Sequence, residues 1–341
     1  MKILRLSTFD TGVRVAGLGS ALGGQVVTNQ QLCALGHPTD PTRVERTTGI
    51  AQRRHLAPGE SVLSMAQRAC ELALGEREAS SLEQLVVSTS SPVSLIPTTG
   101  SALHALLEAG ECPAHTLSAT CSGLLFGLDV AVRGVLTGVE RALVCATEAR
   151  STQLDVTDAS TGALFGDAAS AVLLEPCAPG EGILAIGIVS KASEAPTVRL
   201  GCAREDRLEM VDGSKVYFEA VEGMAQLAAQ MLDQAGLSLE QVDLIVPHQA
   251  NARIIKRLSW LMGRPLEDFY TNLQTIGNTS SASIGVAVHH AVAQGRVGPG
   301  DLMLWLAVGA GYTGGCALVR LDEALCDQVK AQGLNTEAHH V

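Results

Sequence analysis

Three residues of this 341-residue chain carry side chains suited to acyl chemistry. Cys121 lies in the stretch ATCSG, where a short strand (116–118) is predicted to give way to a helix that begins at Gly123. The amides at a helix N-terminus favour a thiolate, which is the nucleophilic form of cysteine. His248 ends the buried stretch VDLIVPH, and Asn278 lies in GNTSSAS. Considered one at a time, such residues are more often a buried structural cysteine, a core histidine and an asparagine that caps a helix than catalytic residues.

An internal repeat connects the three residues. Both halves of the chain show the same predicted order: a strand, a small-residue turn that opens a helix, a second strand, and a glycine turn with a last strand. The strands and the glycine turn with its strand are at 84–88, 142–146 and 166–174 in the first half, and at 243–247, 302–307 and 311–319 in the second. The repeat predicts that Cys121 and Asn278 occupy equivalent positions and that His248 ends the matching inner strand. A Cys, a His and an Asn facing one cleft suit acyl transfer.

Apolar strands that alternate with helices predict an α/β fold whose sheets are covered by helices. Pro176 and the pair Pro179-Gly180 mark the join between the two halves. We therefore expect an N-terminal half over 1–178, a C-terminal half over 179–325 and a loose polar tail over 326–341.

The stretch GAGYTG (309–314) matches the glycine pattern of dinucleotide-binding sites. That pattern needs a helix to open at its third glycine, but a strand-like run from Cys316 to Leu321 follows here. A glycine turn that lends backbone N–H groups to an oxyanion is the better interpretation.

Arg253, Lys256 and Arg257 recur at i, i+3 and i+4 on one face of the helix predicted after His248. Such a face is usually only solvated. On a chain of net charge −11, however, a basic patch also suits an acidic partner, such as a carrier protein or a phosphate. The same net charge argues against general binding to nucleic acid.

The nine cysteines show no spacing typical of a metal site, so no metal is expected. Their odd number and the apolar surroundings of several of them fit a reduced, cytoplasmic protein. The sequence predicts neither a signal peptide nor a membrane-spanning segment.

The motifs VPHQAN, GNTSSASI, FGDAASAVL and ATCSG resemble those of β-ketoacyl-acyl carrier protein synthase III, in the same order and over about 13–321. The resemblance implies a thiolase-like fold of two pseudo-duplicated halves in five layers, α-β-α-β-α. It implies an obligate homodimer, no cofactor, and a catalytic triad of Cys121, His248 and Asn278.

In the implied mechanism, Cys121 attacks an acyl thioester, and the backbone N–H groups of Cys121 and Ala310 hold the tetrahedral oxyanion. A second thioester, of malonyl or acyl type, then forms a carbanion beside His248 and Asn278, and this carbanion attacks the acyl-cysteine. The product is a β-ketoacyl thioester. The implied donors are acyl carrier protein thioesters, acyl-CoA or both.

Several positions depart from the family pattern. Ala310 replaces the middle residue of a glycine triplet and keeps its N–H, whereas Val308 replaces a phenylalanine that helps to shape the pocket. Three residues that hold the nucleotide of coenzyme A in the family are replaced here by Arg43, Thr47 and Ala159.

Two further positions bear on the substrate. The loss of the three nucleotide contacts leads us to expect a carrier-bound donor, and Arg253 matches a family position used in carrier docking. Ile96 aligns with the position that lines the acyl pocket of the partner subunit, where a branched aliphatic residue suits a longer chain.

Other functions remain open. The enzyme could join two acyl or β-ketoacyl chains without decarboxylation, giving a pyrone-type polyketide product, or transfer the acyl group from Cys121 to an alcohol or amine. It could also be a silent partner subunit of a heteromeric synthase. Asn278 argues against the acyltransferase and the intact triad against the silent subunit, while a hydrolase lacks an obvious carboxylate to activate water.

Overall fold

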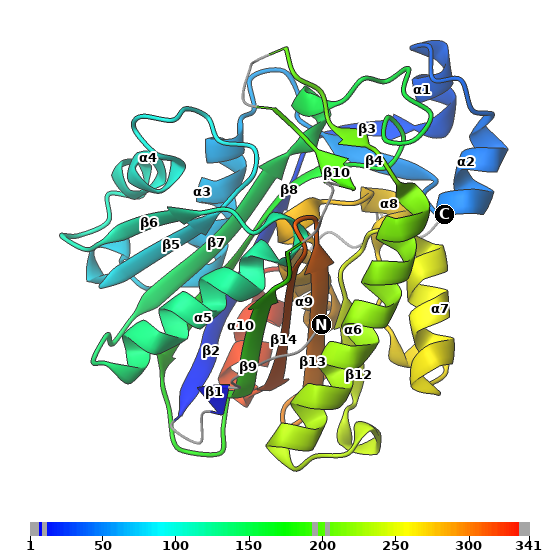
Figure 1. Cartoon of the computed structure of the whole chain (residues 1–341). Coiled ribbons are helices and arrows are strands. Elements are labelled where there is room, and N and C mark those ends of the chain that lie inside the picture. Colours follow the sequence, from blue (N-terminus) through cyan, green and yellow to red (C-terminus); the bar gives the residue numbers. More distant parts are fainter. Residues whose placement is uncertain (1–6, 9–11, 193–196, 202–204, 334–341) are drawn as a thin grey trace.

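Two five-stranded sheets form the frame of the molecule in the computed structural model, which describes residues 7–8, 12–192, 197–201 and 205–333 (Figure 1). The first sheet has the order β2-β8-β7-β5-β6, with β2 (Val13–Leu22), β8 (Asp167–Pro176), β7 (Ala142–Ala149), β5 (Gln84–Ser88) and β6 (Ala114–Leu117). The second has the order β1-β9-β14-β13-β12, with β1 (Ser7–Thr8), β9 (Ile183–Ser190), β14 (Thr313–Arg320), β13 (Leu302–Gly309) and β12 (Leu244–Pro247).

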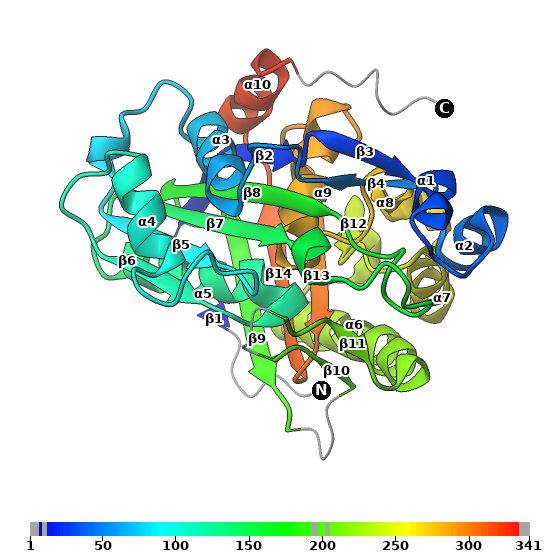
Figure 2. The same ribbon diagram turned by 90° about the horizontal axis from the view of Figure 1, so that it is seen from above.

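Helices occupy three layers around these sheets (Figure 2). Between the sheets lie α5 (Gly123–Leu136) and α9 (Ser283–Ala293), whose apolar residues share one buried cluster with the inner faces of both sheets. The outer face of the first sheet is covered by α3 (Val62–Leu74) and α4 (Thr99–Leu106), and that of the second by α6 (Gly213–Ala235) and α7 (Ala252–Met262). The predicted α-β-α-β-α layering is confirmed.

The remaining α-helices and strands of the described residues are short. They are α1 (Asn29–Ala34), α2 (Pro41–Thr48), α8 (Leu273–Ile276), α10 (Glu323–Ala331) and the paired strands β3 (Gln25–Thr28) with β4 (Gln52–His55) and β10 (Val198–Arg199) with β11 (Glu209–Met210).

The repeat read from the sequence is visible in the strand pairing. In each half an inner strand (β5 or β12) lies parallel to the next strand (β7 or β13), which pairs antiparallel with the last one (β8 or β14). The second half shortens one element, since the counterpart of β6 is a single parallel bridge between Ile245 and Phe269. The chain passes from one sheet to the other between β8 and β9.

The terminal elements cross over between the halves. β1 pairs with β9 in the second sheet, although it precedes every strand of the first sheet. α10 packs on β2 and α9 and places Leu325, Cys326 and Val329 in the cluster between the sheets. Each half is therefore completed by a segment from the other end of the chain.

The expectation of a loose tail from residue 326 is wrong for 326–331, which form the body of α10. The polar composition concealed a narrow apolar stripe, and the side chain of Asp322 caps the helix by accepting a hydrogen bond from the N–H of Leu325. The Gln332 amide adds a bond from Nε2 to the carbonyl of Leu18 in β2. Residues 334–341 lie outside the described part of the chain.

Replacing Leu325 with alanine should destabilise the protein by about 2–5 kcal/mol, because it leaves a cavity in the central layer. The free energy of urea unfolding measures the loss. Asp327→Asn, on the exposed side of α10, is the control and should change it little. An unaltered unfolding midpoint for Leu325→Ala would show that α10 is not a stable part of the fold.

Candidate active site

Cys121 lies in a single turn, η2 (Thr120–Ser122), between β6 and the first residue of α5. Thr120 has a φ of +49°, a left-handed conformation that costs a β-branched residue about 1–2 kcal/mol. Hydrogen bonds hold the turn in place: Thr120 Oγ1 donates to the carbonyl of Ala310 (3.0 Å), and Thr313 Oγ1 donates to that of Ala119 (2.9 Å). Cys121 is thereby presented half-buried at the N-terminal end of α5.

The second half contains the matching turn, but its register corrects the sequence interpretation. The turn η6 (Ser280–Ala282) precedes α9 as η2 precedes α5, and Ser280, with φ +51°, corresponds to Thr120. The structural counterpart of Cys121 is therefore Ser281, and Asn278 lies three residues earlier. The prediction that Cys121 and Asn278 are equivalent is wrong, although the two turns do pack against each other.

The glycine turn after β13 lies directly against the cysteine turn. A Cβ atom on Gly309 would stand 2.1 Å from Thr120 Oγ1 and 2.9 Å from the backbone nitrogen of Cys121, so only glycine fits there. The backbone at 309–310 therefore approaches Cys121 closely, as an oxyanion site built from main-chain amides requires.

His248 follows β12 and is almost fully buried. Its N–H donates to the carbonyl of Leu306 (2.7 Å), which extends the β12–β13 ladder by one bond and positions the ring. The ring Nδ1 lies 2.6 Å from Ser283 Oγ at the start of α9. Burial lowers the pKa of His248 to about 4, so the imidazole is neutral at physiological pH.

Asn278 lies on the same short segment as these contacts. Its backbone is held between the carbonyl of Leu164 (2.9 Å) and the N–H of Gly166 (3.0 Å), and its Oδ1 accepts from the N–H of Ser280 (2.9 Å). The amide oxygen is thereby committed, and the Nδ2 group remains as a donor. Segment 278–283 thus contains Asn278, contacts the His248 ring through Ser283 and approaches the Cys121 sulfur through Ser280 at 3.8 Å.

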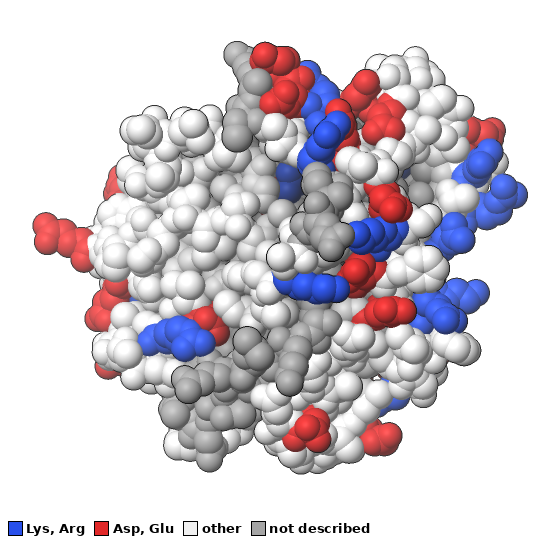
Figure 3. Space-filling model, in the orientation of Figure 1, with Lys and Arg blue, Asp and Glu red and all other residues white. Residues whose placement is uncertain are grey.

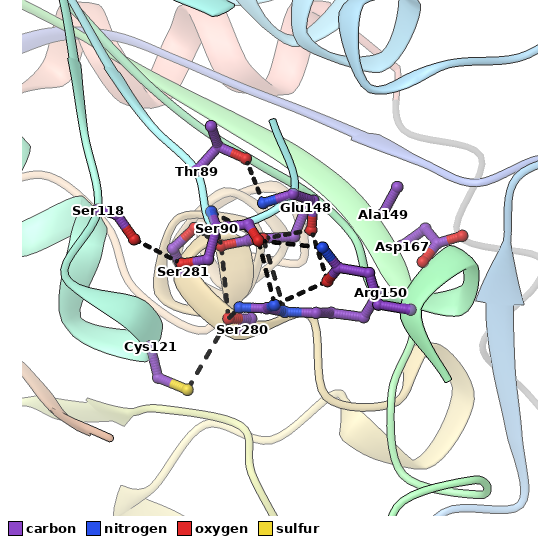
Figure 4. Close-up of polar contacts among 12 residues, drawn as sticks. Thr89, Ser90, Ser118, Cys121, Glu148, Ala149, Arg150, Asp167, Ser280 and Ser281 are labelled. Carbon is purple, nitrogen blue, oxygen red and sulfur yellow. Dashed lines mark hydrogen bonds and ion pairs between the residues drawn. The ribbon is translucent and has the colours of Figure 1, made fainter. Parts of the chain in front are cut away.

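A charged pair that the sequence analysis missed lies behind the cysteine (Figure 4). Glu148 and Arg150 are buried where β7 ends, and Arg150 Nη2 donates to Ser280 Oγ (3.1 Å). Burial raises the pKa of the Cys121 thiol, while the charge of Arg150 and the bond from Ser280 act to lower it. The available signal was the pair of charged residues in TEAR, at the end of a buried strand.

The two pocket residues proposed from the sequence lie in different surroundings. Val308 is buried in β13 and packs in the cluster beneath α6 and α7. Ile96 is 91% exposed, on a loop that also exposes Val93 and Leu95. Within a single chain the structure does not bring Ile96 and Val308 together.

The basic residues at positions 253, 256 and 257 are all exposed on α7, as the helical spacing predicted. The neighbouring helix α2 adds exposed Arg43 and Arg46, and Figure 3 shows basic side chains gathered over this side of the molecule. The two helices touch, because a Cβ on Gly49 would stand 2.4 Å from that of Ala252.

Among the described residues, no group of three or more His, Cys, Asp or Glu side chains could hold a metal ion. Within the same ranges, no helix is both long and apolar enough to cross a membrane.

Comparisons with known proteins show which family the chain belongs to. Residues 116–192 match the family model described as 3-oxoacyl-(acyl-carrier-protein) synthase III, and 232–321 match that of its C-terminal part. β-Ketoacyl-(acyl-carrier-protein) synthase III of Aquifex aeolicus is 35% identical over 91% of this chain and 99% of its own. The crystal structure of the A. aeolicus synthase superposes with a TM-score of 0.87, at 33% identity and with 91% and 100% of the two chains covered.

A second solved structure, the priming β-ketosynthase from the R1128 polyketide biosynthetic pathway, has a TM-score of 0.86 and 29% identity, covering 92% of this chain and 97% of its own. The order of elements, the cysteine turn and the full-length similarity lead to one conclusion. The chain belongs to the β-ketoacyl-acyl carrier protein synthase III family of acyl-transferring, thiolase-fold condensing enzymes.

Proposed function

We propose that this protein condenses an acyl thioester with a second thioester to give a β-ketoacyl product, with Cys121 as the nucleophile. The observation that carries the proposal is the segment 278–283, which connects Asn278, the ring of His248 and the sulfur of Cys121. A Cys-acylated intermediate separates the reaction into two half-reactions that use different parts of this site.

In the first half-reaction the Cys121 thiolate attacks the acyl carbonyl and the thiol of the donor leaves. The backbone N–H groups of Cys121 and Ala310 are the proposed donors to the tetrahedral oxyanion. The close approach of Gly309 to the cysteine turn supports this role, because it brings the two stretches of main chain together. The side chain of Ala310 does not alter its N–H.

In the second half-reaction, His248 and Asn278 donate hydrogen bonds to the carbonyl oxygen of the second thioester while its carbanion forms. A buried, neutral imidazole suits this role because its ring N–H can donate a hydrogen bond without adding a charge. When Ser283 donates to Nδ1, the ring proton resides on Nε2, which faces away from that bond. With a malonyl-type second thioester, the carbanion is left when the bond to the carboxylate breaks and carbon dioxide departs. The carbanion attacks the acyl carbonyl on Cys121, and the Cys121 thiolate leaves.

The acyl donor is proposed to arrive on an acyl carrier protein. The combined basic surface of α2 and α7, made of Arg43, Arg46, Arg253, Lys256 and Arg257, stands out on a chain of net charge −11 and suits an acidic partner. The guanidinium of Arg257 lies 3.9 Å from the ring centroid of Trp260, which is 67% exposed and adds apolar contact area.

The protein is proposed to act as a cytoplasmic homodimer. The apolar loop with Val93, Leu95 and Ile96 exposes side chains that a partner subunit would cover, and Ile96 would then line the partner's acyl pocket. The cysteines of the described residues are all unpaired, which fits a reducing compartment.

Intact-protein mass spectrometry, with acyl-carrier-protein and acyl-CoA donors, tests which residue acts in which half-reaction. Wild type should gain one acyl group, Cys121→Ala none, and His248→Ala should acylate but fail to discharge, with its condensation rate reduced by about 10²–10³-fold. Glu76→Gln, at an exposed position just after α3, controls for handling.

Discharge of the adduct by malonyl thioester with loss of carbon dioxide supports the decarboxylating synthase. Discharge by a second acyl or β-ketoacyl thioester would favour chain joining without decarboxylation, and discharge by an alcohol or amine would favour the acyltransferase. If no donor forms an adduct, Cys121 is not the nucleophile, and the hypothesis of a silent partner subunit remains.

The neutral state of His248 makes folding pH-dependent. The pKa of the His248 ring is about 4 in the folded protein and about 6.5 in the unfolded chain. The contribution of the neutral ring to the free energy of unfolding is therefore present above pH 6.5 and is lost as the pH falls towards 4. Between pH 7 and 4.5, wild type should lose about 2–3 kcal/mol more of its unfolding free energy than His248→Gln. Urea titrations at one protein concentration measure this, and exposed His115→Gln should behave as wild type. Parallel pH profiles for wild type and His248→Gln would contradict it.

Charge reversal on α7 tests carrier docking. The double variant Arg253→Glu/Lys256→Glu should raise the KM for an acyl carrier protein donor by about tenfold at low salt while kcat with acyl-CoA is kept. Lys330→Glu, an exposed charge change on α10, is the matched control. An equal loss with both donors would point to a general defect and against docking on this helix.

A further inference from the structure

The polar network behind Cys121 is built from buried groups that the acyl-transfer steps do not use. Glu148 is fully buried, and Arg150 is 5% exposed. The Glu148 carboxylate accepts hydrogen bonds from Ser91 Oγ (2.8 Å), Ser281 Oγ (2.7 Å) and the N–H of Ser90 (3.2 Å). Figure 4 shows the Arg150 guanidinium beside this carboxylate, and its Nε lies 3.6 Å from Glu148 Oε2.

The direction of the hydrogen bonds in this network follows from the chemistry of arginine. A guanidinium can only donate, so Ser280 Oγ accepts the bond from Arg150 Nη2 at 3.1 Å. The hydroxyl proton of Ser280 must then point to another acceptor. The two that are near are Cys121 Sγ at 3.8 Å and Glu148 Oε1 at 3.5 Å. The contact with Glu148 Oε1 is itself a hydrogen bond donated by Ser280, but that oxygen already accepts from Ser281 Oγ (2.7 Å) and from the N–H of Ser90 (3.2 Å). A thiolate on Cys121 is therefore the charged acceptor with fewer bonds already made to it.

The backbone favours the same interpretation. Ser280 adopts φ +51°, which costs a non-glycine residue about 1–2 kcal/mol, and its N–H is held by Asn278 Oδ1. Strain of this kind persists where the surrounding contacts over-determine it, and here it places the hydroxyl between the guanidinium and the sulfur (Figure 4).

We propose that Arg150 and Ser280 are positioning residues that stabilise the thiolate of Cys121, with Arg150 donating to the Ser280 hydroxyl and that hydroxyl donating to the sulfur. This inference rests on the proposed role of Cys121 as the nucleophile. The relay supplies positive charge to a sulfur whose burial otherwise favours the protonated thiol.

Among the residues that the structure describes, few charged groups face the sulfur besides this pair. Glu148 opposes Arg150, and the third titratable neighbour of the site, His248, is neutral. η6 and β13, which pack on the cysteine turn, contain no charged residue, while β14 carries only Arg320 at its far end. In α5, Asp129 and Arg133 pair with each other at 2.8 Å, away from its first turn.

The test is the pH dependence of Cys121 alkylation by iodoacetamide, followed on the Cys121 peptide by mass spectrometry. Arg150→Gln should move the midpoint upward by about one pH unit and slow alkylation at pH 7.5 by up to about tenfold. Ser280→Ala should move it in the same direction by less. Arg150→Lys keeps the charge and should recover most of the shift, which a purely steric role of the arginine would not allow.

Two variants keep the test decisive. Ser118→Ala loses the bond between its hydroxyl and Ser90 Oγ (2.9 Å) but none to Arg150, Ser280 or Cys121, so its midpoint should equal that of wild type. If Arg150→Gln fails to fold because Glu148 is left unpaired, Glu148→Gln/Arg150→Gln removes both charges, and its midpoint should still exceed that of wild type.

Midpoints equal to wild type in Ser280→Ala and in the foldable arginine variant would overturn the relay. Because alkylation needs no acyl donor, this failure is distinct from a failure of the proposed function. An unshifted midpoint in a protein that still forms the Cys121 acyl adduct refutes only the relay, whereas absence of the adduct refutes the nucleophile.

Discussion

The close approach of the first turns of α5 and α9 is the constraint on which the rest of the site depends. Both helices lie between the sheets, and their N-terminal turns meet there because the residues at the crossing are small. A Cβ on Gly123 would stand 2.0 Å from Ser88 Oγ and 3.1 Å from the Cβ of Ser281, and one on Gly285 would stand 2.3 Å from Ser170 Oγ. With larger residues the turns would separate, and the sulfur of Cys121 would lose its contact with segment 278–283.

This packing also explains the electrostatics of the site. Excluding water from the junction leaves His248 neutral and makes the Cys121 thiol harder to ionise. The first effect suits a hydrogen-bond donor to a developing enolate, and the second works against a nucleophile. Arg150 lies near the Cys121 thiol and not near the His248 ring. One buried environment can therefore keep the imidazole neutral while the nearby positive charge favours the thiolate.

The sequence analysis placed Cys121, His248 and Asn278 near strand and helix ends, because they interrupt the residue patterns that predict β6–α5, β12 and α9, and the structure has them near those ends. It missed Ser280, Ser283 and Arg150, whose roles depend on contacts between segments more than one hundred residues apart in two of the three cases. It also misplaced the repeat by three residues, since small-residue turns of similar composition can be aligned in more than one register. The sequence analysis missed α10 because only three apolar side chains in a polar segment indicate it. Their burial follows from the packing of α10 on β2, which the sequence does not show.

The crossing of the terminal elements has a consequence for dividing the chain. A cut in the connection between β8 and β9 would assign one five-stranded sheet to each fragment. It would leave the first fragment without α10, which packs on β2, and the second without β1, which pairs with β9. Neither fragment would retain a closed core. The two halves are therefore one cooperative unit, and a half-length polypeptide with this topology could fold only by borrowing the missing pieces from another copy of itself.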